Sequence, residues 1–119
     1  MADQTITPKL IAQDAVTELA AGDYEDLTAA NDGVVTPPKD GKYLLHFIDA
    51  AGGATVTITG GDGPLGSQGD IKNAAVMTIN LHNFAVVESA RVKQLSGSDI
   101  GKIRITTDQN IKAACVYFR

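Results

Sequence analysis

The sequence predicts an all-β protein, built as an antiparallel sandwich or barrel of about eight short strands. Composition is the first reason, because the 119-residue chain has twelve glycines, no tryptophan and many Val, Ile and Thr residues. Such a composition favours short strands and tight turns. The second reason is that apolar and polar residues alternate in several segments. The third is that turn residues recur roughly every 8–12 residues, as in known sandwiches and barrels.

Residues 1–22 precede the predicted strands and are ambiguous. Thr7 and Pro8 suit the N-cap and first position of a helix, and Gly22 suits its end. Local signals therefore favour a helix slightly. The alternative is an extended arm over residues 1–22, followed by a single domain over residues 23–119.

Two strands are predicted around the small-residue turn at 50–53. Residues 42–49, KYLLHFID, form a compact apolar run that predicts a strand buried on most of its surface. Residues 55–59 alternate strictly, with Val56 and Ile58 on one face and three threonines on the other. This pattern predicts a half-buried strand.

The other predicted strands are shorter or less regular. They are an edge strand within 23–30, a short piece at 34–36 and strands at 74–82, 84–87, 91–95, 101–107 and 111–118. In the strand at 74–82, the alternation places Ala75, Met77, Ile79 and Leu81 on one face. Asp108–Asn110 predicts a hairpin loop between the last two strands. Residues 60–73 predict a long glycine-rich loop, of the kind that is usually functional or mobile.

Charge and cysteine content restrict the classes of function. The formal net charge of −4 argues against a nucleic-acid surface. Residues 1–62 carry ten acids and three lysines, whereas residues 63–119 carry four acids and seven basic residues. The two halves therefore predict either a polarised docking surface or strands whose charges intermix. The single Cys115 excludes an intrachain disulfide. No stretch has the length of a signal h-region or a membrane span, so we expect synthesis in the cytoplasm and no membrane partner.

No pattern in the sequence predicts catalysis, a cofactor or a metal site. Gly61–Gly66 matches G-x-G-x-x-G, but no helix follows to meet a pyrophosphate. His46 and His82 have no metal-ligand spacing around them, so structural roles are favoured, although a sandwich can bring two distant strands together. Cys115 lies in an apolar strand with no basic neighbour, which argues against a nucleophile. The loop acids Asp62, Asp70 and Asp99 do not follow the calcium-loop pattern.

Several segments together resemble the small head decoration (cement) proteins of tailed bacteriophages. They are a polar turn ending in Asp-Gly-Lys, the strand YLLHFI, an Ala/Gly turn and the strand TVTI. Later come GKIRIT, a turn and the closing strand IKAACVYF. The Thr-Pro-x-x-Ile lead-in of these proteins is extended, so the resemblance implies an extended arm and not a helix. The chain departs from them in its acidic Asp23–Asp26 patch and in the length of the Gly60–Asn73 loop.

The resemblance implies a non-enzymatic virion protein that decorates and stabilises the capsid exterior. Its expected partner is the phage major capsid protein, bound by a monomer or a homo-trimer. It implies no cofactor, metal, nucleic acid or membrane. The expected docking residues lie in the arm and the glycine loop: Thr5, Ile6, Thr7, Pro8, Lys9, Leu10, Ile11, Gly63, Pro64, Leu65 and Gly66. The alternatives are a soluble carbohydrate- or surface-binding β-sandwich, opposed by the lack of tryptophan, and a small barrel enzyme, opposed by the lack of a nucleophile–base pair.

Overall fold

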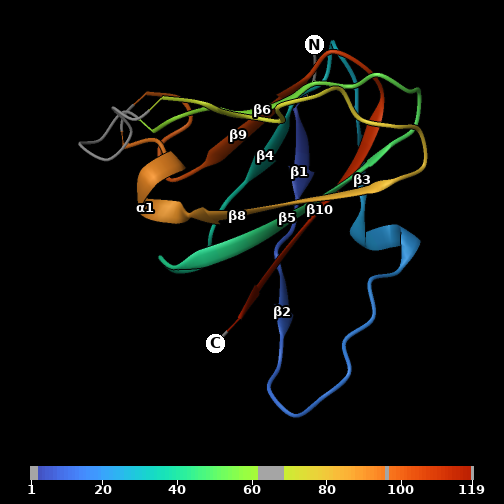
Figure 1. Cartoon of the computed structure of the whole chain (residues 1–119). Coiled ribbons are helices and arrows are strands. Elements are labelled where there is room, and N and C mark those ends of the chain that lie inside the picture. The colour runs from blue at the N-terminus through green and yellow to red at the C-terminus, as the bar shows by residue number, and fades with distance from the viewer. Residues whose placement is uncertain (1–2, 62–68, 96, 119) are drawn as a thin grey trace.

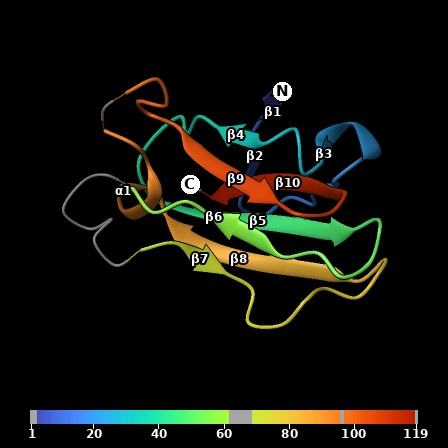
Figure 2. The ribbon, with the colours of Figure 1, turned by 90° about the horizontal axis from the view of Figure 1, so that it is seen from above.

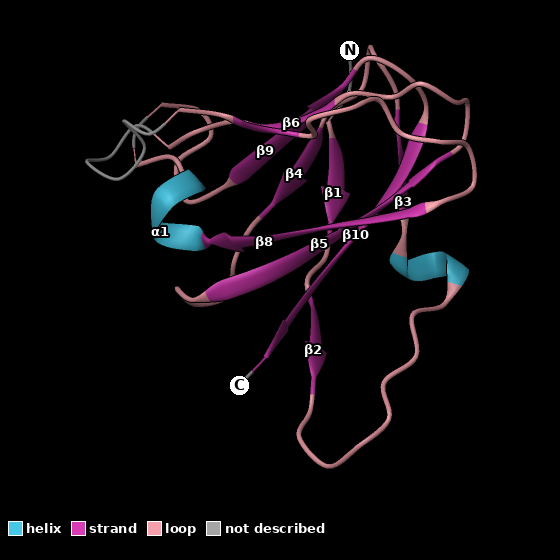
Figure 3. Cartoon of the chain, viewed as in Figure 1, coloured by secondary structure: helices cyan, strands magenta, loops and turns pink. Residues whose placement is uncertain are grey.

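Strands make up nearly all the regular structure of the computed structural model, which describes residues 3–61, 69–95 and 97–118 (Figures 1 and 3). One short α-helix and one 3₁₀ helix, η1, accompany them. The elements in chain order are β1 (Gln4–Ile6), β2 (Lys9–Ile11), η1 (Ala21–Asp23), β3 (Glu25–Leu27), β4 (Gly33–Val35), β5 (Lys42–Asp49), β6 (Val56–Ile58), β7 (Ile71–Lys72), β8 (His82–Glu88), α1 (Ser89–Val92), β9 (Ile103–Thr107) and β10 (Ile111–Phe118).

The strands form two stacked sheets. The first sheet has the order β1-β4-β9-β6-β7, and the second has the order β2-β10-β5-β8, with β3 also paired to β10. Seen from above, β9 and β6 lie over β10 and β5, and β7 lies near β8 (Figure 2). The all-β prediction is confirmed in this form: the molecule is sandwich-like and is not a closed barrel. The described residues contain ten strands, more than the eight predicted.

The prediction of a purely antiparallel arrangement is wrong. β1 runs parallel to β4, and β2 runs parallel to β10, while the other strand pairs are antiparallel. Both parallel pairs join strands that are distant in the sequence. No hairpin turn connects them, so nothing in the chain path forces the antiparallel direction.

The N-terminal segment forms the strands β1 and β2 where local signals favoured a helix, and only its end, at Ala21 and Gly22, belongs to η1. β1 pairs with β4 in the first sheet, and the chain then crosses at Thr7 and Pro8 to place β2 beside β10 in the second sheet. Pro8 lies between the two strands, where its missing N–H costs no ladder bond. Ile6 is buried in the core. Pairing with both sheets outweighs the local helix signals of residues 7–22.

The connections that the sequence suggested as hairpins are arches between the sheets. The predicted hairpin at Asp108–Asn110 is wrong, because β9 belongs to the first sheet and β10 to the second. β5 and β6, which the turn at 50–55 connects, likewise belong to different sheets. The two arches lie together, since the Ala50 N–H donates to the Asn110 carbonyl and the Thr55 N–H donates to the Asp108 carboxylate. Alternation fixes the face that a side chain occupies, but it does not fix the neighbouring strand.

Two predicted strands are absent. Residues 74–81 are irregular, and of the predicted face only Met77 is buried, whereas Ala75, Ile79 and Leu81 are exposed. Met77 is held by backbone hydrogen bonds with Gly53 and Ala54 of the first arch. The strand predicted at 91–95 is replaced by the end of α1 and an isolated β-bridge between Gln94 and Ile100. In both segments, packing against a neighbouring loop overrides the local alternation.

The core lies between the sheets and consists of the inward-facing residues of both. From β5 it receives Tyr43, Leu45 and Phe47, and from β10 it receives Ala113 and Cys115. The first sheet adds further aliphatic residues: Ile6, Val35, Val56, Ile58, Ile103 and Ile105. The predicted inward face of Val56 and Ile58 is thereby confirmed, and so is the predicted burial of most of residues 42–49.

We expect the substitution Gly61→Ala to destabilise the fold by about 1–3 kcal/mol, since it overpacks a buried contact. A Cβ at Gly61 would lie 2.7 Å from the carbonyl oxygens of Arg91 and Lys93. The Gly61 N–H already donates to the Arg91 carbonyl, so the backbones cannot easily separate. Urea unfolding measures the change. The matched control is Gly22→Ala, where the new Cβ meets open space and the stability should change little.

Candidate docking surface

The predicted docking residues of the arm are largely occupied by the fold itself. Ile6 is buried, and Pro8, Lys9, Leu10 and Ile11 are half-buried between or within β1 and β2. Only Thr5 and Thr7 are exposed. Gly63, Pro64, Leu65 and Gly66 lie outside the described residues. The structure therefore places residues 5–11 in the sheets, with few side chains turned to solvent.

The segment that projects from the body is the next one along the chain, residues 12–20, here called the projecting loop. It begins after the end of β2 and extends away from both sheets (Figure 1). Lys9 closes its base, donating to the Glu18 carbonyl at 2.7 Å and pairing with the Asp23 carboxylate at 2.9 Å. The side chain of Val16 is fully exposed in this loop. The local signals of residues 7–22 favoured a helix, so no signal in the sequence indicated this loop.

The outer face of the second sheet carries large exposed side chains. Alternation turns Leu44, His46 and Ile48 of β5 to this face, together with the partners of β5 on the neighbouring strand β8. Phe84 and Val86 of β8 are 62% and 67% exposed, and Phe118 of β10 is 51% exposed. We call Leu44, Phe84, Val86 and Phe118 the outer apolar face. A grouping of this kind on one surface is typical of an interaction site.

A chain of three polar rings borders this face. The Tyr24 hydroxyl lies 2.8 Å from Nδ1 of His46, and Nε2 of His46 lies 2.8 Å from Nδ1 of His82. Phe84 stacks on His46 with ring centres 4.5 Å apart and an angle of 10° between the planes. The histidines come from β5 and β8 at diagonal positions, because Ile48, not His46, is directly opposite His82. Without the register, the sequence could not show that the two rings meet.

His46 lies at the centre of this chain of rings, between Tyr24 and His82. His46 is buried, and its pKa is held below the ordinary value by desolvation and then by the nearby His82. Tyr24 follows η1, so the hydrogen bond to His46 also fixes the end of the projecting loop against the second sheet. Among the described residues, no three or more His, Cys, Asp and Glu side chains gather closely enough to share a metal ion. Elsewhere, burial raises the pKa of the Cys115 thiol to about 12.

The stability of the protein should fall as the pH drops below the ordinary histidine pKa of 6.5. The folded pKa of His46 is depressed, so the unfolded chain binds the proton more readily and gains stability in acid. Each unit of pH can cost at most about 1.4 kcal/mol from this residue. Urea unfolding between pH 7.5 and 5.5 measures the slope. The slope should shrink in His46→Gln and remain in Thr57→Gln, and an unchanged slope in His46→Gln would contradict the assignment.

The charges of the two chain halves pair with each other in the fold. Lys93 binds Asp40, Lys112 binds Asp26, and Arg104 binds both Asp3 and Asp32. In each pair the acid comes from the first half and the base from the second. The uneven charge along the sequence is therefore partly cancelled in space, which favours the intermixed alternative over a polarised surface.

Comparison of the chain with protein-family models, with curated proteins and with solved structures found no match. None of the helices in the described part of the chain has the length and apolar character needed to cross a membrane.

Proposed function

We propose that the protein is a structural virion component that decorates the exterior of a phage head and stabilises it by binding the major capsid protein. The observation that carries the proposal is the outer apolar face next to the projecting loop. Together they offer exposed apolar contact area on a two-sheet body. The order of the elements, which resembles that of phage decoration proteins, supports the same assignment.

The mechanism would be stabilisation by binding alone. A body that contacts neighbouring capsid subunits buries surface that exists only in the assembled lattice. Binding to the assembled state, and not to free subunits, shifts the equilibrium toward assembly by mass action. No chemical step is needed, and copies bound across the shell add their contributions.

The projecting loop suits a docking role because it extends away from the body (Figure 1) and its hydrogen bonds with the body through Lys9 lie at its base. The side chain of Val16 is apolar and fully exposed, so docking would not have to break contacts of this side chain with the rest of the protein. Burying a valine that is fully exposed is worth about 1.5–3 kcal/mol. The two ends of the loop are held by β2 and by the Tyr24–His46 hydrogen bond, which limits the entropy lost on docking.

Co-pelleting with heads assembled without this protein tests the proposal. We expect the wild-type chain to bind and Val16→Asp to bind about tenfold more weakly or worse, from the lost burial. Ile100→Asp is the control, since Ile100 is also an exposed apolar residue, and it lies on the loop before β9. The number of copies bound per site distinguishes a monomer from a homo-trimer. Failure of the wild-type chain to bind heads would refute the proposed function.

A further inference from the structure

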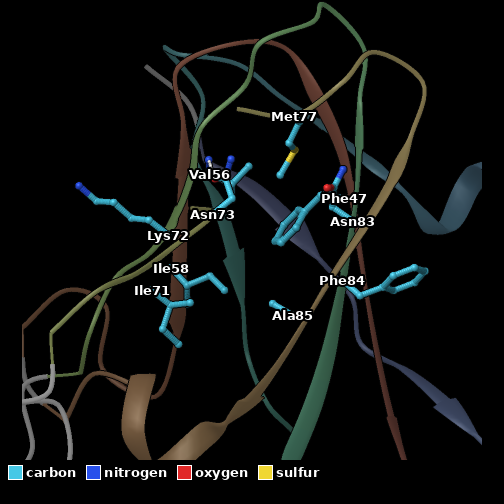
Figure 4. Close-up of a pocket in the computed structure, with 10 residues that line it drawn as sticks. All are labelled: Phe47, Val56, Ile58, Ile71, Lys72, Asn73, Met77, Asn83, Phe84 and Ala85. Carbon is cyan, nitrogen blue, oxygen red and sulfur yellow. Dashed lines mark hydrogen bonds between the residues drawn. The ribbon is translucent and has the colours of Figure 1, made fainter. Parts of the chain in front are cut away.

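A cavity of about 210 Å³ opens between the sheets at their β7 and β8 edges. Six apolar side chains form most of its wall: Phe47, Val56, Ile58, Ile71, Met77 and Ala85. Figure 4 shows Phe47 and Met77 turned toward the space, whereas Phe84 points away from it to the outer face. An apolar cavity of about 150 Å³ can hold benzene. This cavity is therefore large enough for one apolar side chain.

Two of the three polar residues at the cavity rim, Asn73 and Asn83, are already used by the fold, and the third, Lys72, points away from the cavity (Figure 4). Asn73 accepts a hydrogen bond from the Val56 N–H at 2.8 Å and donates to the carbonyls of Ala54 and Ala75. The Asn83 amide donates to the Leu81 carbonyl. The rim thus offers few polar groups to a guest, and the interior favours an apolar one.

The cavity exists because the two edge strands differ in length. β7 has two residues, whereas β8, at the same side of the sandwich, has seven. Beyond β7 the chain continues irregularly through residues 73–81, so it does not form a regular layer over the inner side of β8. Ala85, a small residue on that inner side, leaves the remaining space unfilled.

β8 also has an unpaired edge. It pairs with β5 on one side and is the last strand of the second sheet among the described residues. An unpaired edge presents backbone N–H and C=O groups to any extended segment. Along this edge, inward and outward side chains alternate: Ala85 borders the cavity, while Phe84 and Val86 belong to the outer apolar face.

We propose that an extended segment of the major capsid protein pairs with the free edge of β8 and places one apolar side chain in the cavity. The inference rests on the proposed function, since that function supplies the partner. Strand addition uses backbone hydrogen bonds for affinity and pockets for alternate side chains for specificity. Here the cavity accepts the inward side chain, and Phe84 and Val86 contact its outward neighbours. The segment must therefore be apolar on both faces at its centre.

Two substitutions test the edge and the cavity separately by the same co-pelleting assay. Ala85→Leu fills the cavity, and Val86→Lys puts a charge on the edge, a device that blocks strand addition. We expect each to weaken binding to heads at least tenfold. Ile100→Lys, at an exposed position outside β8, should bind as the wild type does. Thermal unfolding of each variant shows whether the body remains folded, and a folded variant with weakened binding supports the inference.

Hydrogen exchange gives a second, independent readout on the wild-type chain. Binding should slow exchange at those β8 amides that do not donate to β5, and leave the exposed amides of β7 unprotected. If the folded variants Ala85→Leu and Val86→Lys bind heads as tightly as the wild type does, the β8 edge and the cavity are not the binding site. The proposed function would remain intact. If the wild-type chain does not bind heads, both the proposed function and this inference are wrong. If the wild-type protein is a dimer and Val86→Lys is a monomer, the segment that pairs with β8 comes from a second copy of this chain. That result would overturn the proposal that the segment comes from the major capsid protein.

Discussion

Replacing Asp49 with alanine is expected to lower the free energy of unfolding by about 3–5 kcal/mol, because several backbone donors lose their partner in the interior. The Asp49 carboxylate is completely buried and accepts three N–H groups of the first arch, from Ala51 at 3.0 Å, Gly52 at 2.8 Å and Ala54 at 3.1 Å. Without it the arch has no acceptor in its centre. Urea unfolding at neutral pH measures the loss.

The contribution of the Asp49 carboxylate to stability should also depend on pH. Burial alone would raise the pKa of Asp49, but the three backbone donors outweigh burial and hold the pKa below the ordinary value of 3.8. A depressed carboxyl pKa gives stability that is present above the ordinary value and is lost as the pH falls below it. Asp49→Asn should therefore be less stable at neutral pH and lose less stability in acid than the wild type.

Asp108→Ala is the matched control for this arch. The Asp108 carboxylate accepts a single N–H, from Thr55 at 2.7 Å, and its residue is exposed. Water can replace that bond, so the expected cost is about 1 kcal/mol or less. Equal losses in Asp49→Ala and Asp108→Ala would show that burial of the acceptor does not control the stability of the arches.

Replacing Arg104 with leucine is expected to cost about 2–4 kcal/mol, somewhat less than a fully buried ion pair because the site is partly open to water. The guanidinium uses all five of its N–H donors on three acids. It contacts Asp99 through Nε and Nη2, Asp32 through Nη1, and Asp3 through Nη1 and Nη2, at 2.6–3.0 Å. These hydrogen bonds hold the pKa values of Asp3 and Asp99 below their ordinary value.

The reason for the large effect is what remains after the substitution. Three carboxylates would be left close together with no positive partner, and they come from the segment before β1, the turn before β4 and the loop before β9. Arg104→Lys keeps the charge but cannot bond all three acids, so its loss should be intermediate. Urea unfolding of both variants measures the order.

Lys112→Met provides the contrast. Lys112 and Asp26 form a single ion pair of 2.8 Å, and their side chains are 52% and 76% exposed. A pair of this kind contributes about 0–1 kcal/mol. A loss as large in Lys112→Met as in Arg104→Leu would mean that the convergence of three acids on Arg104 adds nothing.

The sequence predicted the long strands well and their partners poorly. The bounds of β5 and β10 follow from apolar runs that end at turn residues, and the inward faces of β6 and β9 follow from strict alternation. The same alternation at 74–82 misled the prediction, since Ile79 and Leu81 remain exposed. A local pattern reports burial on a face, but only the tertiary fold decides whether a core lies there.

The candidate site depended even more on tertiary structure. The meeting of His46 with His82 requires the register of β5 against β8, and the cavity requires that β7 stop after two residues. Neither condition leaves a local trace in the sequence. The placement of Val16 depended on the pairing of β2 with β10, because that pairing removes residues 9–11 from the helix that local signals favoured.

The pairing of β2 with residues 116–118 has a consequence for synthesis on the ribosome. A nascent chain that lacks those residues has no neighbour for β2, and residues 9–11 must stay unpaired until nearly the whole described chain has emerged. Closure of the second sheet then joins segments more than a hundred positions apart, which makes folding slow relative to proteins built from local contacts. Assembly of the second sheet is thus tied to the synthesis of residues 116–118.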